Sequence, residues 1–156
     1  MNSFVVTVPA AAQAEAAITS SAFWPDVEPD KIRAAQRIDT TITIERLREA
    51  LIDAIASVNT ELSAWRIAQI ASGHAILSDV PAEEVDNTSI NIHRYLRAVG
   101  CMAKASLIER TRDYDTTAAG NKQTDQLETP IDDLRRDARW AISDILGIGR
   151  TTVELI

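Results

Sequence analysis

A long apolar stripe between Thr43 and Gly73 constrains the fold of this chain more than any other feature of its sequence. The large apolar residues of the stripe are Ile44, Leu47, Leu51, Ile55, Val58, Leu62 and Trp65. They recur at steps of three or four residues, which is the repeat of one face of an α-helix. Thr43 can cap the first turn, and Gly73 can end the helix without a Cβ clash. We therefore predict one helix of about thirty residues, roughly 45 Å long.

Such a helix is marginal alone in water, so its stripe requires other helices to cover it. Two further segments, residues 89–112 and 130–146, carry apolar residues at helical spacing, and residues 29–38 carry a shorter pattern. Small residues such as Gly100 in the 89–112 segment let other helices approach, so we expect that helix to be central. The sequence therefore predicts an all-α fold, a helical bundle of three long helices plus a short N-terminal helix.

The chain of 156 residues has the length of one domain, flanked by segments that lack an apolar stripe. We expect a mobile N-terminal arm at residues 1–22, in which residues 4–8 have the pattern of a short strand. The helical domain is expected at residues 23–147, with a flexible polar loop at residues 114–129. An extended C-terminal tail is expected at residues 148–156.

Two segments are candidates for contact with a partner. Phe23 and Trp24 precede a proline, which favours an extended peptide, and two large rings left in water would be costly. Docking of these rings on their own domain and docking on a neighbour are both open. In the tail, Arg150 is followed by apolar residues near the end of the chain, namely Val153, Leu155 and Ile156. We expect the tail to join the edge of a partner's sheet; packing on its own bundle, or pairing with residues 4–8, is the alternative.

Residues with catalytic or metal-binding chemistry are scarce. His74 and His93 lack a second ligand at the spacing of a metal site, so a surface or structural role is expected for both. Cys101 has the features of a small buried residue rather than a nucleophile. The Gly-Ile-Gly-Arg-Thr stretch at residues 147–151 lacks the Gly-Lys-Ser/Thr ending of a phosphate loop. The sequence therefore predicts no enzyme, no cofactor and no metal site.

The charge pattern narrows the class of partner. The formal net charge of −7 argues against a general nucleic-acid binder, which needs a basic face. Aspartates and arginines alternate in the last predicted helix, which predicts an exposed face of mixed charge. The segment after Gly73 is acidic and is expected to be a solvated loop, with Glu83, Glu84 and Asp86. We expect no signal peptide and no membrane segment, because no apolar run approaches the length of about 20 residues that a span needs.

Several segments, in order along the chain, resemble the head completion or head stabilisation proteins of contractile-tailed temperate phages. The matching pieces include FWPDV at 23–27, ERLREA at 45–50, NTEL at 59–62, LSDVPA at 77–82, RAV at 97–99, AKASL at 103–107 and IDDLRRDARWA at 131–141. The resemblance runs from about residue 22 to the C-terminus and omits the N-terminal arm. His93 and Arg94 stand where this family would have aromatic residues.

The resemblance implies a structural virion protein at the head–tail junction, assembled in the host cytoplasm after DNA packaging. It implies a homo-oligomeric ring, a dodecamer, that binds the portal protein and offers a platform to the neck and tail completion proteins. DNA would pass through its channel without sequence-specific binding, and an acidic lining would help because like charges repel. The alternatives are a small helical adaptor or regulator that binds a soluble protein through Phe23 and Trp24, and a small helical enzyme with an unrecognised site.

Overall fold

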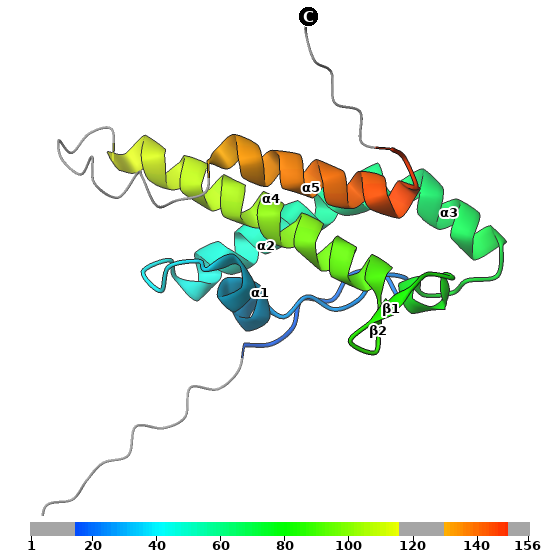
Figure 1. Ribbon diagram of the computed structural model, residues 1–156. Coiled ribbons are helices and arrows are strands. Elements are labelled where there is room, and N and C mark those ends of the chain that lie inside the picture. Colours follow the sequence, from blue (N-terminus) through cyan, green and yellow to red (C-terminus); the bar gives the residue numbers. More distant parts are fainter. Residues whose placement is uncertain (1–14, 116–129, 150–156) are drawn as a thin grey trace, which may run out of the picture.

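A computed structural model describes residues 15–115 and 130–149, without the side chains of residues 112–115. Within these residues the chain is mostly helical, which confirms the predicted predominance of helix (Figure 1). The elements are α1 Pro29–Gln36, α2 Ile44–Glu61, α3 Ser63–Ala71, the 3₁₀ helix η1 Leu77–Asp79, β1 Glu84–Val85, β2 Thr88–Ser89, α4 Ile90–Asp115 and α5 Ile131–Leu146.

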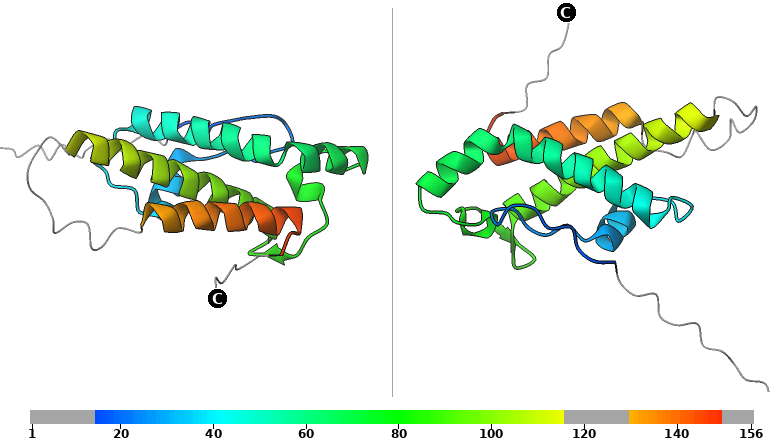
Figure 2. Two further views of the ribbon diagram at one scale, coloured as in Figure 1. Left: turned by 90° about the horizontal axis from the view of Figure 1, so that it is seen from above. Right: turned by 180° about the vertical axis from the view of Figure 1, so that it is seen from behind.

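The central helix of the bundle is α4. Seen from above, α2 and α3 lie on one side of α4 and α5 lies on the other, while α1 packs against α2 and α4 (Figure 2). The buried residues of α4 therefore point in two directions. Tyr95 and Val99 join the cluster that includes the α2 stripe, whereas Cys101 and Ala105 pack with Leu134 of α5. The prediction of a central helix in this segment is confirmed.

The predicted long helix is divided in two, so the exact bundle of three long helices is not confirmed, although α2, α4 and α5 have 18, 26 and 16 residues. Leu62 separates α2, of 18 residues, from α3, of nine, and its φ of −88° and ψ of 3° are not helical. The hydroxyls of Ser57 and Thr60 donate to backbone carbonyls one turn earlier, at 2.9 and 2.8 Å. Hydroxyl groups bonded in this way bend helices. The apolar stripe keeps its phase through Leu62, so periodicity alone does not reveal the break.

The segment before α1 is an extended strap, residues 15–28, that lies across the bundle. The backbones of Ile18 and Val27 exchange two hydrogen bonds, of 2.8 and 3.0 Å, and both side chains are buried. The chain is therefore anchored from Ile18 or earlier, ahead of the arm boundary expected at residue 22. The strand expected at residues 4–8 and most of the loop expected at 114–129 lie outside the described residues.

A hairpin occupies part of the segment that was expected to be a solvated loop. Asp86 and Asn87 have φ values of 54° and 55°, the left-handed pair that joins two strands in a tight turn. Asn and Asp tolerate this conformation better than other side chains that bear a Cβ. Leu77 and Val80, just before the hairpin, are buried. The expectation of a wholly solvated loop was wrong, although its acidic side chains are exposed.

The helices α1 and α5 begin and end near their predicted residues. Pro29 occupies the first helical position of α1, where its missing N–H costs no hydrogen bond within the helix. Pro130 is the N-cap of α5, so this helix begins one residue after the start of the predicted range, and Gly147 ends it with a φ of 69°. The predicted stripe of α5 is buried from Leu134 onward, Ile142 joins it, and its first residue, Ile131, is only partly buried. No helix within residues 15–115 and 130–149 is both long and apolar enough to cross a bilayer.

Candidate interaction surfaces

Phe23 and Trp24, the first predicted contact segment, belong to the core of their own domain. Their side chains are 3% and 4% exposed. The Trp24 ring stacks on Tyr95 with the centroids 4.8 Å apart and the planes 7° from parallel. Phe23 meets the Trp24 ring edge-on at 4.8 Å and the Trp65 ring at 6.2 Å. Of the two alternatives for these rings, docking on their own domain is the one observed, and they offer almost no surface to a partner.

Hydrogen bonds hold the strap across several elements. The Leu77 amide, in η1, donates to the Phe23 carbonyl at 2.8 Å. The guanidinium of Arg66, in α3, donates to the Ser21 hydroxyl at 3.1 Å. The strap therefore ties α3 and the segment after it to the rest of the bundle, although α3 itself packs little against the core.

Two buried titratable groups have shifted pKa values, and neither is arranged for catalysis. Burial raises the pKa of Tyr95 to about 12, and its hydroxyl donates to Asn59 Oδ1 at 2.9 Å. Burial also raises the pKa of the Cys101 thiol, which keeps it in its unreactive protonated form. The prediction of a small buried cysteine is confirmed. Among the described residues, no three His, Cys, Asp or Glu side chains are placed to hold a metal ion.

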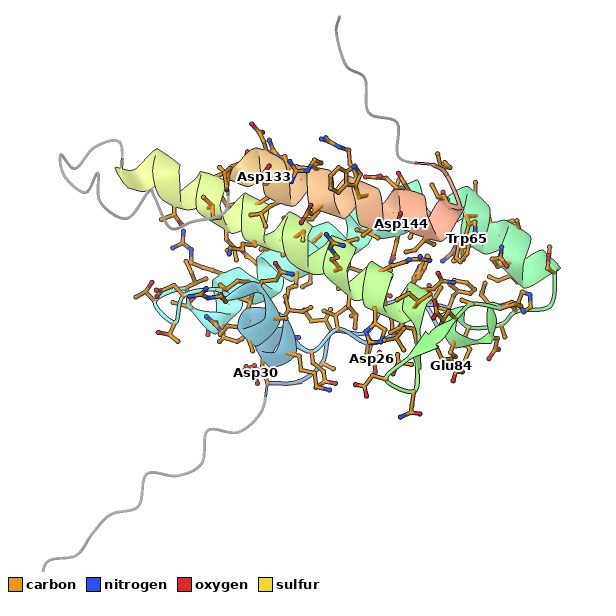
Figure 3. All side chains as sticks on the ribbon, viewed as in Figure 1. Asp26, Asp30, Trp65, Glu84, Asp133 and Asp144 are labelled. Atoms are coloured by element: carbon orange, nitrogen blue, oxygen red, sulfur yellow. The ribbon has the colours of Figure 1, made fainter. Side chains whose placement is uncertain are left out.

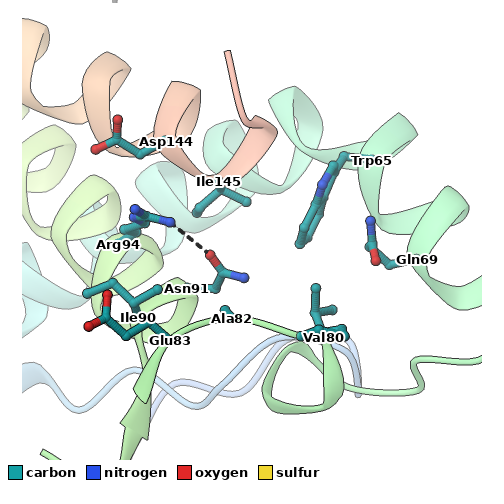
Figure 4. Close-up of a pocket in the computed structure, with 11 residues that line it drawn as sticks. Trp65, Gln69, Val80, Ala82, Glu83, Ile90, Asn91, Arg94, Asp144 and Ile145 are labelled. Carbon is teal, nitrogen blue, oxygen red and sulfur yellow. Dashed lines mark hydrogen bonds between the residues drawn. The ribbon is translucent and has the colours of Figure 1, made fainter. Parts of the chain in front are cut away.

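A hollow of about 440 Å³ lies where α3, the start of α4 and the end of α5 meet. Trp65 stands between α3 and the end of α5 (Figure 3) and forms a wall of the hollow with Ile145 (Figure 4). Arg94 reaches in from α4 and donates to Asn91 Oδ1 at 3.3 Å. None of the described residues that line the hollow is a Ser, Thr, Cys, Lys or His. The hollow can receive a side chain of a partner, but it has no nucleophile beside a base.

Large exposed apolar side chains gather at the same end of the molecule. In the described part of the chain five of the six belong to α3, the loop after it, the hairpin or the residue after α5 (Figure 1). These five are Ile67, Ile70, Ile76, Val85 and Ile148. No residue of α3, which is described over its whole length, is buried, and Ile67 is 63% exposed. Apolar side chains gathered in this way are typical of a surface that binds another protein.

The tail residues of the second contact segment lie beyond the described chain, which ends at Gly149. These residues are Arg150, Val153, Leu155 and Ile156. The last described residues follow the cap of α5 at Gly147, and Ile148 is 57% exposed. The chain therefore leaves the bundle at the end that holds α3 and the hollow. A role of the tail in contact stays a prediction.

Comparison with known proteins agrees with these surfaces in pointing to assembly rather than catalysis. A family model described as phage head completion protein (GPL) matches residues 18–156. A head completion/stabilization protein of Escherichia phage P2 is 42% identical over 151 residues, which are 97% of this chain and 89% of that protein. No solved structure matches. The family consists of structural phage proteins and not of enzymes. With a match over most of its length, the chain belongs to the phage head completion protein family.

Proposed function

We propose that the protein forms a ring at the head–tail junction, docks under the portal once DNA is packaged, and stabilises the filled head. The observation that carries the proposal is the 42% identity, over 97% of the chain, to a head completion/stabilization protein. The exposed apolar end supports it, because exposed apolar side chains gathered in this way are typical of a surface that binds another protein. The virion is then the site of action, and assembly takes place in the host cytoplasm.

In this proposal the ring is a dodecamer whose partners are the portal on one side and the neck and tail completion proteins on the other. Packaged DNA passes through the channel without sequence-specific contacts. The net charge of −7 supports this role, because an acidic lining would not retain a polyanion. A protein that held DNA tightly would need a broad basic surface, and the acidic composition of this chain does not supply one.

The tail is the segment proposed to contact the portal, through Arg150 and the apolar residues Val153, Leu155 and Ile156. It follows a capped helix, so it does not simply extend the bundle. An extended segment has unpaired backbone groups, which the edge of a partner's sheet would satisfy. The alternative function, an adaptor that binds through Phe23 and Trp24, loses its support because both rings are buried.

A truncation tests the proposed portal contact. If the tail binds portal and not its own bundle, deletion of residues 150–156 should leave the melting temperature unchanged while binding to purified portal of the same phage is lost. Electron microscopy of the mixture should show an added ring on the portal with the full chain only. A chain that lacks residues 1–8 is the matched control and should bind. Full-strength binding by the C-terminal truncation would contradict the contact, and unfolding would place the tail in the domain.

A further inference from the structure

We propose that the ring closes by packing the outer face of α2 and α3 of one copy against the outer face of α5 of the next copy. Each contact then joins two different surfaces of the chain, an arrangement that generates a ring when the rotation between copies closes. This inference rests on the proposed ring and names the surfaces that close it. The partner is a second copy of the chain, because the exposed charges on the two faces have opposite net sign and follow a matching order.

The first half of the α2–α3 outer face is acidic. Glu45, Glu49 and Asp53 recur at steps of four residues, opposite the buried stripe, and all three are exposed. Arg46 is exposed beside them, so the net charge of these four residues is negative. Neither Glu45 nor Glu49 forms an ion pair with any residue that the structure describes, whereas Asp53 lies 3.2 Å from Arg110. Two glutamates on this face are therefore available to an arginine from outside.

The second half of the same face is apolar and made largely of small residues. Its exposed apolar members are Ala56, Ala64, Ile67, Ala68, Ile70 and Ala71, and the exposed hydroxyl residues Ser57, Thr60 and Ser63 lie among them. A helix whose outer face stays in water normally carries charged side chains there. The charged side chain of α3, Arg66, is half-buried and donates to the strap. The α2–α3 outer face thus changes from acidic to apolar along its length, and small residues let another helix approach it.

The α5 outer face has the complementary order. Its exposed residues in the first half are Asp132, Arg135, Arg136 and Arg139, a net positive set. Arg135 and Arg136 are half-exposed and pair with Glu109 and Asp133 of the same copy, which leaves further N–H donors on each guanidinium. Arg139 forms no ion pair with any described residue. The face ends without charge at Ile148, which is 57% exposed.

The fold places these two faces on opposite sides of the molecule and in the same direction. Figure 2 shows α2–α3 on one side of α4 and α5 on the other side. The α2–α3 pair and α5 both begin at the same end of the molecule and run in the same direction. Copies set side by side around a ring axis keep corresponding ends together. The acidic half of α2 would then meet the basic half of α5, and α3 would meet the segment at Ile148. Contact between two α2 faces is disfavoured, because their carboxylates would repel.

Reversal of one charge on each face tests the contact. Glu49→Arg and Arg139→Glu should each weaken assembly about tenfold or more, because like charges would face each other. An equimolar mixture of the two variants should assemble again, since each altered face meets the complementary altered face of the other variant. Particle mass is measured for the protein alone and on purified portal. Glu84→Arg, the same charge change on the hairpin, is the control and should assemble normally.

Two outcomes would overturn the inference. One is a mixture that stays as poorly assembled as the single variants, with both shown to be folded by circular dichroism. The other is normal assembly of either single variant. If the single variants fail to assemble, their mixture forms rings, and these rings do not bind portal, the proposed portal docking is contradicted and the contact between copies is supported. If the wild-type protein forms no ring, either alone or on portal, both proposals are contradicted.

Substitution in α3 tests the apolar half separately. Ile67→Ser should weaken assembly, whereas Ala34→Ser, at an exposed position of α1 outside both faces, should leave it unchanged. If Ile67→Ser instead assembles normally and loses portal binding, the portal and not a second copy covers α3. If deletion of residues 150–156 and the Ile67→Ser substitution each abolish assembly to the same extent, the tail of the chain covers α3. Each of these results would overturn the contact between α3 and α5.

Discussion

Two neighbouring residues of α2, Leu51 and Ile52, show how sharply this helix separates inside from outside. Leu51 is fully buried in the main cluster, and Ile52 is 51% exposed on the outer face. The stripe of the sequence correctly predicts the burial of Leu51. It does not distinguish a solvated Ile52 from one that a neighbour covers, because burial between copies leaves no mark on the periodicity of one chain.

Leu51→Ala should lower the free energy of unfolding by about 2–5 kcal/mol, because the substitution leaves a cavity in a packed core. Ile52→Ala is the matched control and should change it by about 0.5 kcal/mol or less, the usual range for a surface substitution. Urea unfolding of the monomer measures both. Equal losses at the two positions would contradict the assignment of inner and outer faces.

Tyr95 makes stability depend on pH in the alkaline range. Its pKa is about 12 in the folded chain, against an ordinary value of 10.0, because burial disfavours the charged phenolate. The unfolded chain therefore releases this proton first, and stability that is complete below pH 10 falls as the pH rises towards 12. Tyr95→Phe should lose less stability than the wild type between these pH values. Identical pH profiles in thermal melts would contradict the effect.

The α2–α3 break is the element at which sequence reasoning fails most clearly. Patterns of period 3.6 locate α2, α4 and α5 because each buries apolar residues at helical spacing. They miss the break at Leu62, where hydroxyl hydrogen bonds act within an unbroken pattern. They also miss the hairpin, although Asp86 and Asn87 between two β-branched residues were a readable turn signal. The partner of Trp24 is Tyr95 on a distant helix, which no local pattern could supply.

Because no residue of α3 is buried, its amides should exchange with solvent faster than those of α2 in the monomer. Assembly through the proposed contact should slow exchange in α3 and leave the buried turns of α4 unchanged. Hydrogen–deuterium exchange of the two states, read by mass spectrometry, measures this difference. The proposal fails if α3 is as protected as α2 in the monomer, or if assembly leaves its exchange unaltered.

At the level of the whole molecule, the exposed charge is net negative on the first half of α2 and net positive on the first half of α5, and the domain has an apolar end. A contact that joins the first two is screened by salt, since the Debye length falls from about 10 Å at 0.1 M to about 3 Å at 1 M. Ring formation should therefore weaken as salt rises, while the melting temperature of the monomer changes little. Light scattering at the two salt concentrations checks this, and stronger assembly in high salt would assign the contact to apolar surface alone.

The three tryptophans stand in three different environments, and this gives the protein its own optical reporters. Trp24 is stacked inside the core, Trp65 borders the hollow, and Trp140 lies on α5 with the Arg136 guanidinium 4.7 Å above its ring. Emission from Trp24 follows unfolding, whereas emission from Trp140 should respond to a neighbour placed on α5. Variants that keep one tryptophan each would let folding and ring closure be followed in real time without an added dye.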